Sequence, residues 1–96
     1  MAYIYDMKYL SWNPDKNETL KRERGISFEE IAYLIELGRI IGIEENPGRS
    51  NQKLYILEIE GYAFVVPFVE TDQEIFQKTA FPSRKYTKQY GLKGES

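Results

Sequence analysis

“KLYILEIEGYAFVVPFV”, residues 53–69 of the 96-residue chain, consists of two strand-like runs around a short Glu-Gly turn. Residues 53–60 and 62–69 are rich in β-branched, aromatic and aliphatic side chains, and their spacing predicts a β-hairpin. Because both faces of residues 62–69 are apolar, we expect this strand near the centre of a sheet. Pro67 has no N–H to donate, so the strand should leave the hydrogen-bonded ladder near its end.

Further strands are expected on both sides of this hairpin. Residues 39–45 precede it across a turn-rich loop, “NPGRSNQ”, and residues 73–80 follow it as a fourth strand of the same sheet. An earlier strand is expected at residues 7–12. These runs predict a twisted antiparallel sheet of about four strands.

Two helices are predicted before the sheet. In the first, over residues 14–24, Asn13 is a suitable cap before Pro14. The second begins with a capping box, Ser27 with Glu30, and its apolar side chains recur at helical spacing. A short C-terminal helix is expected over residues 83–90, after Pro82.

The order of these elements predicts an α+β fold, with two N-terminal helices packed on the antiparallel sheet and a short C-terminal helix. The length suits a single domain over residues 1–96. Met7 offers an alternative start, which would make residues 1–6 an extension. The tail, residues 92–96, is expected to be frayed.

Composition excludes several chemistries. The chain has no cysteine and no histidine, which removes disulfides, thiolate zinc sites, cysteine nucleophiles and the commonest general base. No apolar run approaches the roughly 18 residues of a membrane span, and the start does not resemble a signal peptide. A cytoplasmic protein is therefore expected.

Charge is distributed unevenly along the chain, whose formal net charge is −2. The stretch “IFQKTAFPSRKYTKQYG”, residues 75–91, carries positive charges and no negative one, whereas the middle of the chain is acidic. A solvated surface explains many charge runs. The alternative is that the cationic end binds an anion.

The acidic residues raise the possibility of a magnesium-dependent nuclease. Glu58 and Glu60 would share one face of a strand, as two metal-binding carboxylates do. They also lie at the end of a hairpin, where exposed charges are ordinary. No phosphate-binding glycine motif is present, and we expect neither a metal site nor a cofactor.

The basic residues near the C-terminus favour RNA. Lys78 lies on the last predicted strand, and Arg84 and Lys88 are four residues apart on the helix, as are Tyr86 and Tyr90. Cations hold phosphate, and aromatic rings stack on unpaired bases. The alternative is a solvated helix whose tyrosines pack on the sheet.

Two motifs carry a resemblance to a known family. “WNPDKNETLKRERGISFEEI” and “QKTAFPSRKYTKQY” are similar to the opening and closing motifs of the BrnT branch of RelE-like bacterial toxins. The resemblance spans roughly residues 9–91 and implies the RelE-like version of the fold above. Arg84 and Lys85 match an Arg-Lys pair of the family, whereas Arg24 stands where the family has a histidine.

The resemblance implies the toxin of a type II toxin–antitoxin pair, acting as a metal-independent endoribonuclease that blocks translation. The implied partners are an RNA substrate and a ribbon-helix-helix antitoxin of the BrnA or CopG kind. The complex would bind operator DNA only through this antitoxin. Two alternatives stay open. One is a non-catalytic protein-binding module, and the other is a ParE-like toxin acting on gyrase or DNA.

Cleavage through the substrate's 2′-hydroxyl needs a base, an acid and positive charge on the phosphorane. The expected catalytic residues are Arg84, Lys78, Glu58 and Tyr86. In these roles Arg84, with Lys78 or Lys53, stabilises the phosphorane. Glu58 or a tyrosine such as Tyr86 takes the proton, and a lysine returns one. The expected substrate-binding residues are Lys21, Arg22, Arg24, Lys53, Lys85 and Lys88.

Overall fold

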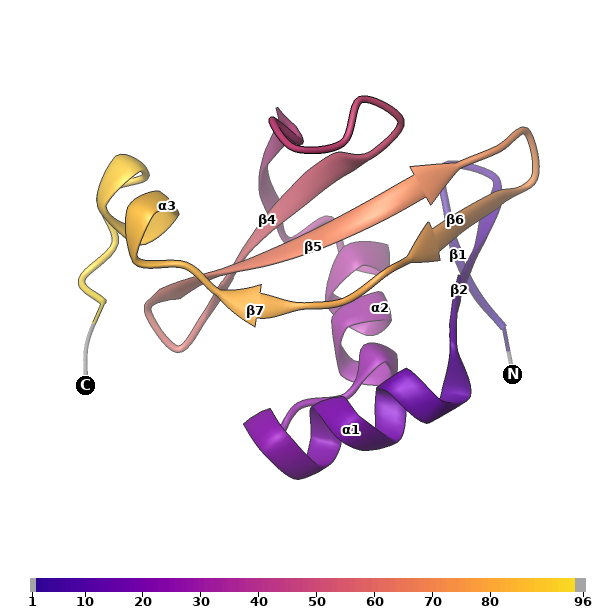
Figure 1. The fold of residues 1–96 in the computed structure, drawn as a ribbon, viewed down its shortest axis with the longest axis horizontal. Coiled ribbons are helices and arrows are strands. Elements are labelled where there is room, and N and C mark those ends of the chain that lie inside the picture. Colours follow the sequence, from indigo (N-terminus) through magenta and orange to yellow (C-terminus); the bar gives the residue numbers. More distant parts are fainter. Residues whose placement is uncertain (1, 95–96) are drawn as a thin grey trace.

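The computed structural model describes residues 2–94 and shows an α+β domain with three helices and one seven-stranded sheet (Figure 1). None of the helices in this part of the chain is long and apolar enough to cross a lipid bilayer. The strands are β1 (Tyr3–Tyr5), β2 (Lys8–Trp12), β3 (Ile40–Glu45), β4 (Lys53–Ile59), β5 (Tyr62–Glu70), β6 (Glu74–Gln77) and β7 (Phe81–Pro82). The helices are α1 (Pro14–Arg24), α2 (Phe28–Glu36) and α3 (Arg84–Gln89).

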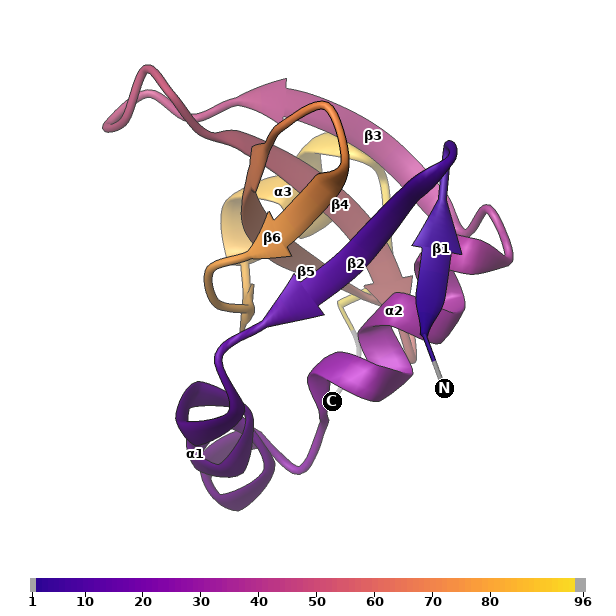
Figure 2. The same ribbon diagram turned by 90° about the vertical axis from the view of Figure 1, so that its right-hand side faces the viewer.

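The sheet differs from the expected one. Its order is β1-β2-β6-β5-β4-β3, with β7 pairing with β5, and it curls into a half-barrel (Figure 2). The β2–β6 pair is parallel and the other pairs are antiparallel, so the sheet is mixed. The predicted RelE-like fold, two N-terminal helices on an antiparallel sheet of about four strands, is therefore wrong.

The N-terminal hairpin is the main reason for this correction. Residues 3–5, for which the sequence predicted no strand, form β1 and pair with β2. The hairpin then joins the sheet because Leu10 and Trp12 lie opposite Ile75 and Gln77 of β6 in a parallel register. Such a pairing joins strands far apart in the sequence, and local residue patterns contain no signal for it.

The two N-terminal helices begin as their sequences predict. Asn13 caps α1, and its side chain accepts from the backbone N–H groups of Asp15 and Lys16. Ser27 and Glu30 form the predicted capping box of α2. Asn17, which is buried, links the two helices: its Oδ1 accepts from the backbone N–H of Phe28 at 2.7 Å.

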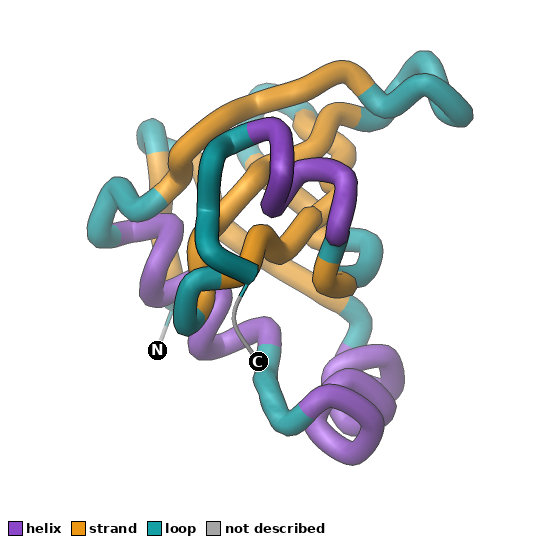
Figure 3. The backbone as a smooth tube through the Cα atoms, turned by 90° about the vertical axis from the view of Figure 1, so that its left-hand side faces the viewer, coloured by secondary structure: helices purple, strands orange, loops and turns teal. Residues whose placement is uncertain are grey.

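Both faces of the sheet are covered, but by different helices. Along β4, Tyr55 and Leu57 point into the main core with α2, whereas Leu54 and Ile56 pack on the opposite face with Tyr86 of α3. Figure 3 shows α3 lying across the strands on that second face. Because α3 is short, it covers only part of the second face.

Helix α3 is fixed to β5 and β3 by specific contacts. The backbone N–H of Ala63 donates to Thr87 Oγ1 at 2.9 Å, and the backbone N–H of Ser83 donates to Ala63 O at 2.9 Å. The Tyr90 hydroxyl donates to Glu44 and lies over Gly42, where an added Cβ would come within 2.1 Å of that hydroxyl oxygen. A side chain at position 42 would therefore displace the tyrosine.

The segment after α3 continues along the sheet. The backbone N–H of Leu92 donates to Thr87 O, and that of Gly94 donates to Gly61 O at 3.0 Å. Residues 92–94 of the tail expected to be frayed are thus hydrogen-bonded. Residues 95–96 of that tail lie outside the described part of the chain.

The predicted strand 73–80 is shorter than expected, because β6 ends at Gln77 and the next strand, β7, begins only at Phe81. β6 pairs with one end of β5, β7 pairs further along it, and residues 78–80 between them are not in a strand. The backbone N–H of Lys78 still donates to Pro67 O at 2.8 Å. Pro67 has no N–H to return, so the ladder cannot continue through this point.

Candidate functional site

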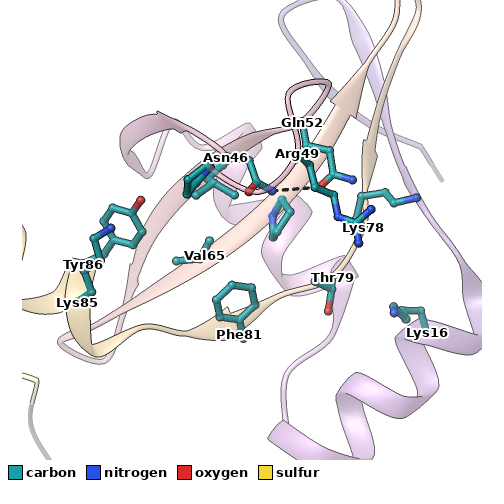
Figure 4. A pocket seen from close by; sticks show the side chains of 13 residues that line it. Lys16, Asn46, Arg49, Gln52, Val65, Lys78, Thr79, Phe81, Lys85 and Tyr86 are labelled. Carbon is teal, nitrogen blue, oxygen red and sulfur yellow. Dashed lines mark hydrogen bonds between the residues drawn. The ribbon is translucent and has the colours of Figure 1, made fainter.

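The part of the second sheet face that α3 leaves open forms a cleft of about 590 Å³ (Figure 4). Its floor is apolar and consists of Leu54, Val65 and Pro67 from β4 and β5. The walls come from the loop 46–52, the broken segment after β6, and the ends of α1 and α3. The polar, charged and aromatic lining residues are Lys16, Asn46, Arg49, Gln52, Lys78, Thr79, Phe81, Lys85 and Tyr86, with Pro47 beside them.

Four of these side chains are cationic. Lys16 comes from α1, Arg49 from the loop before β4, Lys78 from the break after β6 and Lys85 from α3. Within residues 2–94, none of the four forms a salt bridge, and the lining contains no carboxylate. Positive charge gathered from four elements without a counter-ion favours binding of an anion.

The strand break at Pro67 creates one wall. Because the chain leaves the ladder after Gln77, Lys78 is exposed and Thr79 faces the cleft, while the next residue, Ala80, is buried. The sequence pattern predicted Lys78 on the last strand of the sheet. That expectation is wrong, since β6 ends at Gln77.

Aromatic rings lie beside the charges. Phe81 is 37% exposed at the cleft, although it belongs to β7. Tyr86 is buried and stacks on Tyr90 with ring centroids 6.3 Å apart. The Lys85 ammonium lies 5.1 Å from the centre of the Tyr86 ring. Phe81 therefore offers an accessible ring, and Tyr86 forms part of the fixed wall.

Three of the predicted site residues meet in this cleft: Lys78, Lys85 and Tyr86. Arg84, the leading catalytic candidate, does not line it. It lies with Lys88 beside Tyr62 and Leu92 in a separate hollow. The convergence of Arg84 with Lys78 that the sequence suggested is therefore not found.

The remaining candidates are dispersed. Lys53 lines another hollow beside Glu70, and Glu58 is exposed on β4, four residues along the strand from Leu54 in the cleft floor, a separation of about 13 Å. Arg24 lines a hollow next to the cleft, together with Lys16.

The two other basic candidates on α1 interact locally. Lys21 pairs with Glu18 at 3.3 Å, and Arg22 contacts Thr19. Neither lines the cleft. Lys21 and Arg22 are thus exposed side chains whose described contacts lie within α1.

Several lining residues were not singled out from the sequence: Lys16, Asn46, Arg49, Gln52, Thr79 and Phe81. One of them carried a usable signal, because Lys16, Leu20 and Arg24 repeat every four residues, which places them on one face of α1. Leu20 is buried, so that face is turned toward the protein. The loop 46–52 offered no comparable signal, since its position over the sheet depends on tertiary folding.

Other chemistry is limited in the described part of the chain. Residues 2–94 contain no group of three or more acidic or other metal-ligating side chains close enough to hold a metal ion. Near the cleft, the hydrogen bond to Glu44 raises the pKa of Tyr90 to about 12, with a smaller contribution from burial. That shift favours the protonated phenol, so Tyr90 is a structural anchor and a poor base.

Comparison of the chain with models of known families, with curated proteins and with solved structures finds no match. The resemblance to BrnT toxins is therefore an expectation from the two sequence motifs alone, and the fold that it implied is not the one observed. The cleft supplies a separate line of argument, because it depends only on this chain's own residues.

Proposed function

We propose that the protein binds single-stranded RNA in the cationic cleft and acts on it as a metal-independent endoribonuclease of the toxin type. The observation that carries the proposal is a set of four cations, none in a salt bridge within residues 2–94, around an apolar floor with an accessible ring at Phe81. Cationic grooves with stacking aromatics are the usual means of holding single strands. The two BrnT-like motifs favour RNA over other anions.

The geometry also bears on the chemistry. In the proposed reaction the substrate's 2′-oxygen attacks phosphorus and loses its proton, and the bond from phosphorus to the 5′-oxygen breaks as that oxygen gains a proton. In this proposal Lys78 and Arg49, which both line the cleft, stabilise the negative phosphorane. Glu58 is remote from the cleft and cannot act as the base there. Among the residues that line the cleft, Tyr86 and the lysines carry the side chains that can exchange a proton.

Binding is tested with a fluorescent ten-nucleotide RNA and paired variants. Arg49→Ala and Lys78→Ala should each weaken binding about tenfold, as expected for loss of a charge-assisted contact. Arg22→Ala and Lys53→Ala remove the same charges outside the cleft and should change the affinity less than twofold. Equal losses in both pairs would contradict the assignment of the cleft.

Cleavage is tested separately with the same RNA and with a copy carrying one 2′-deoxynucleotide at the cleaved position. The proposal predicts cleavage of the first, ending in a 2′,3′-cyclic phosphate, and none of the second. Cleavage of both would indicate attack by water. Tight binding without cleavage would support the non-catalytic module instead.

The proposal includes a partner, a ribbon-helix-helix antitoxin. An acidic segment of such a protein would neutralise the cations of the cleft and exclude RNA. The test is co-expression with the product of any adjacent small reading frame, followed by RNA competition. A complex that still binds RNA with unchanged affinity would contradict this inhibitory role.

A further inference from the structure

The loop between β3 and β4 is held in one shape by its own backbone. The N–H of Arg49 donates to Asn46 O at 3.2 Å, and the N–H of Gln52 donates to Arg49 O at 3.1 Å. Two consecutive turns therefore link position 46 to position 52. This loop forms a fixed wall of the cleft (Figure 4).

The same loop fixes the orientation of two side-chain amides. The backbone N–H of Gly48 donates to Asn46 Oδ1 at 3.0 Å, so the other end of that amide is the nitrogen. Asn46 Nδ2 then donates to Gln52 Oε1 at 3.2 Å. Because each amide has one oxygen and one nitrogen, this chain of bonds leaves the Gln52 nitrogen directed away from Asn46.

Gln52 belongs to the wall of the cleft, and most of its side chain is buried. It is 9% exposed and lines the cleft, and its Nε2 donates to no described residue. In Figure 4 its nitrogen lies on the side of Arg49 and Lys78. Although the side chain as a whole is nearly buried, its nitrogen is not among the fully enclosed atoms, so its N–H groups are free to donate to a ligand in the cleft, or to water in its absence.

We propose that Gln52 selects the nucleobase bound in the cleft, and that it favours guanine and uracil. These two bases carry a carbonyl group at the 6-position of the purine and at the 4-position of the pyrimidine, respectively. This inference rests on the proposed function, because it concerns the RNA bound at that site. Asn46 acts as a positioning residue that holds the Gln52 nitrogen toward the base.

The selectivity follows from hydrogen-bond complementarity. Guanine and uracil present a carbonyl oxygen where adenine and cytosine present an amino group. The Gln52 N–H groups can donate a hydrogen bond to a carbonyl oxygen. Opposite an amino group they would meet a second donor, and no hydrogen bond could form. Phe81, on another wall of the same cleft, offers a face on which any base can stack, so the amide and not the ring distinguishes them.

The first experiment ranks four five-nucleotide RNAs that differ only in the central base. In a background of abasic flanking nucleotides, guanine and uracil should bind about tenfold more tightly than adenine and cytosine. Inosine, which has the 6-carbonyl but lacks the 2-amino group of guanine, should bind like guanine. Equal affinities for all central bases would overturn the inference.

The second experiment turns the side-chain amide of Gln52 around by changing its neighbour Asn46 and leaving Gln52 itself in place. In Asn46→Asp one carboxylate oxygen still accepts from Gly48, and the other must receive the Gln52 nitrogen, which turns the Gln52 oxygen toward the base. The preference should then shift to adenine and cytosine, even as the added negative charge weakens all binding. An unchanged ratio of guanine to adenine affinity in the folded variant would overturn the inference.

A third variant covers the case in which Asn46→Asp does not fold. Gln52→Glu keeps the shape and offers acceptors only, so it should also favour amino-bearing bases. Circular dichroism and thermal melting report folding of both variants. Binding that depends on Arg49 and Lys78 but is indifferent to the base would overturn this inference and leave the proposed function intact; absence of RNA binding would overturn both.

Discussion

At the scale of single residues, Gln77 stands out, because it is a fully buried polar side chain with no hydrogen-bond partner among residues 2–94. It is 0% exposed, and neither its Nε2 nor its Oε1 is hydrogen-bonded to this part of the chain. In the sheet it lies between Phe68 of β5 and Trp12 of β2, at the core. Burying an amide without hydrogen bonds costs stability.

Replacing Gln77 by methionine, which has a similar length and no amide, should therefore stabilise the protein by about 1–3 kcal/mol. For a domain of this size that corresponds to a rise in Tm of about 4–8 °C per kcal/mol. Gln73→Met, the same change at an exposed position, is the control and should leave Tm nearly unchanged. A lower Tm for Gln77→Met would contradict the account and indicate a bound water.

The raised pKa of Tyr90 predicts that the stability of the fold falls at alkaline pH. Its folded-state pKa of about 12 lies above the ordinary tyrosine value of 10.0, chiefly because of the hydrogen bond to Glu44. A raised pKa means that this contribution to stability is complete below pH 10 and is lost as the pH rises toward 12. Tyr90→Phe should therefore flatten the fall in unfolding free energy between these pH values, measured by urea denaturation. Equal slopes in both proteins would contradict this.

At the scale of elements, α3 and the strand break decide where the cleft is. Thr87 joins α3 to β5, because its hydroxyl accepts from Ala63 N–H and donates to Ser83 O at 2.6 Å. Together with the Ser83–Ala63 hydrogen bond and the packing of Tyr86, this anchor holds Lys85 and Tyr86 at the cleft.

Thr87→Val retains the shape of the side chain but leaves the buried Ala63 N–H unpaired, which should cost about 1–3 kcal/mol. Thr87→Ser keeps the hydroxyl and should cost less. Thermal melts of the two variants compare them directly. A serine variant as unstable as the valine variant would show that the methyl group, and not the hydrogen bond, holds α3.

The elements themselves were largely predictable from the sequence. The bounds of α1 and the caps of α1 and α2 follow from Asn13, Ser27 and Glu30, because capping acts within a few residues of the chain. The break opposite Pro67 was only partly anticipated. Its effect on residues 78–80 depends on which strand lies beside β5, and that is a tertiary property.

At the scale of the whole molecule, the sequence indicated the α+β class but not the sheet. The parallel β2–β6 pair joins residues more than sixty positions apart, and no local pattern specifies such a contact. The cleft was missed for the same reason. Lys16, Arg49, Lys78 and Lys85 come from four elements and meet only after the sheet has curled.

The overall charge makes this cleft easy to test. Since the formal net charge is −2, the protein as a whole does not attract RNA, and any strong salt dependence must come from local cations. For single strands, the slope of log affinity against log salt concentration is about −0.7 per phosphate contact. Four cations in contact with phosphates would give a slope of about −2.8.

The most direct test of the central claim is therefore this slope, measured by fluorescence anisotropy for the wild type and for the Arg49→Ala/Lys78→Ala double variant. We predict a slope near −2.8 for the wild type and about −1.4 for the double variant, since two phosphate contacts are lost. Arg22→Ala/Lys53→Ala should match the wild type. Identical slopes for the wild type and the cleft variant, or no binding at low salt, would contradict the account.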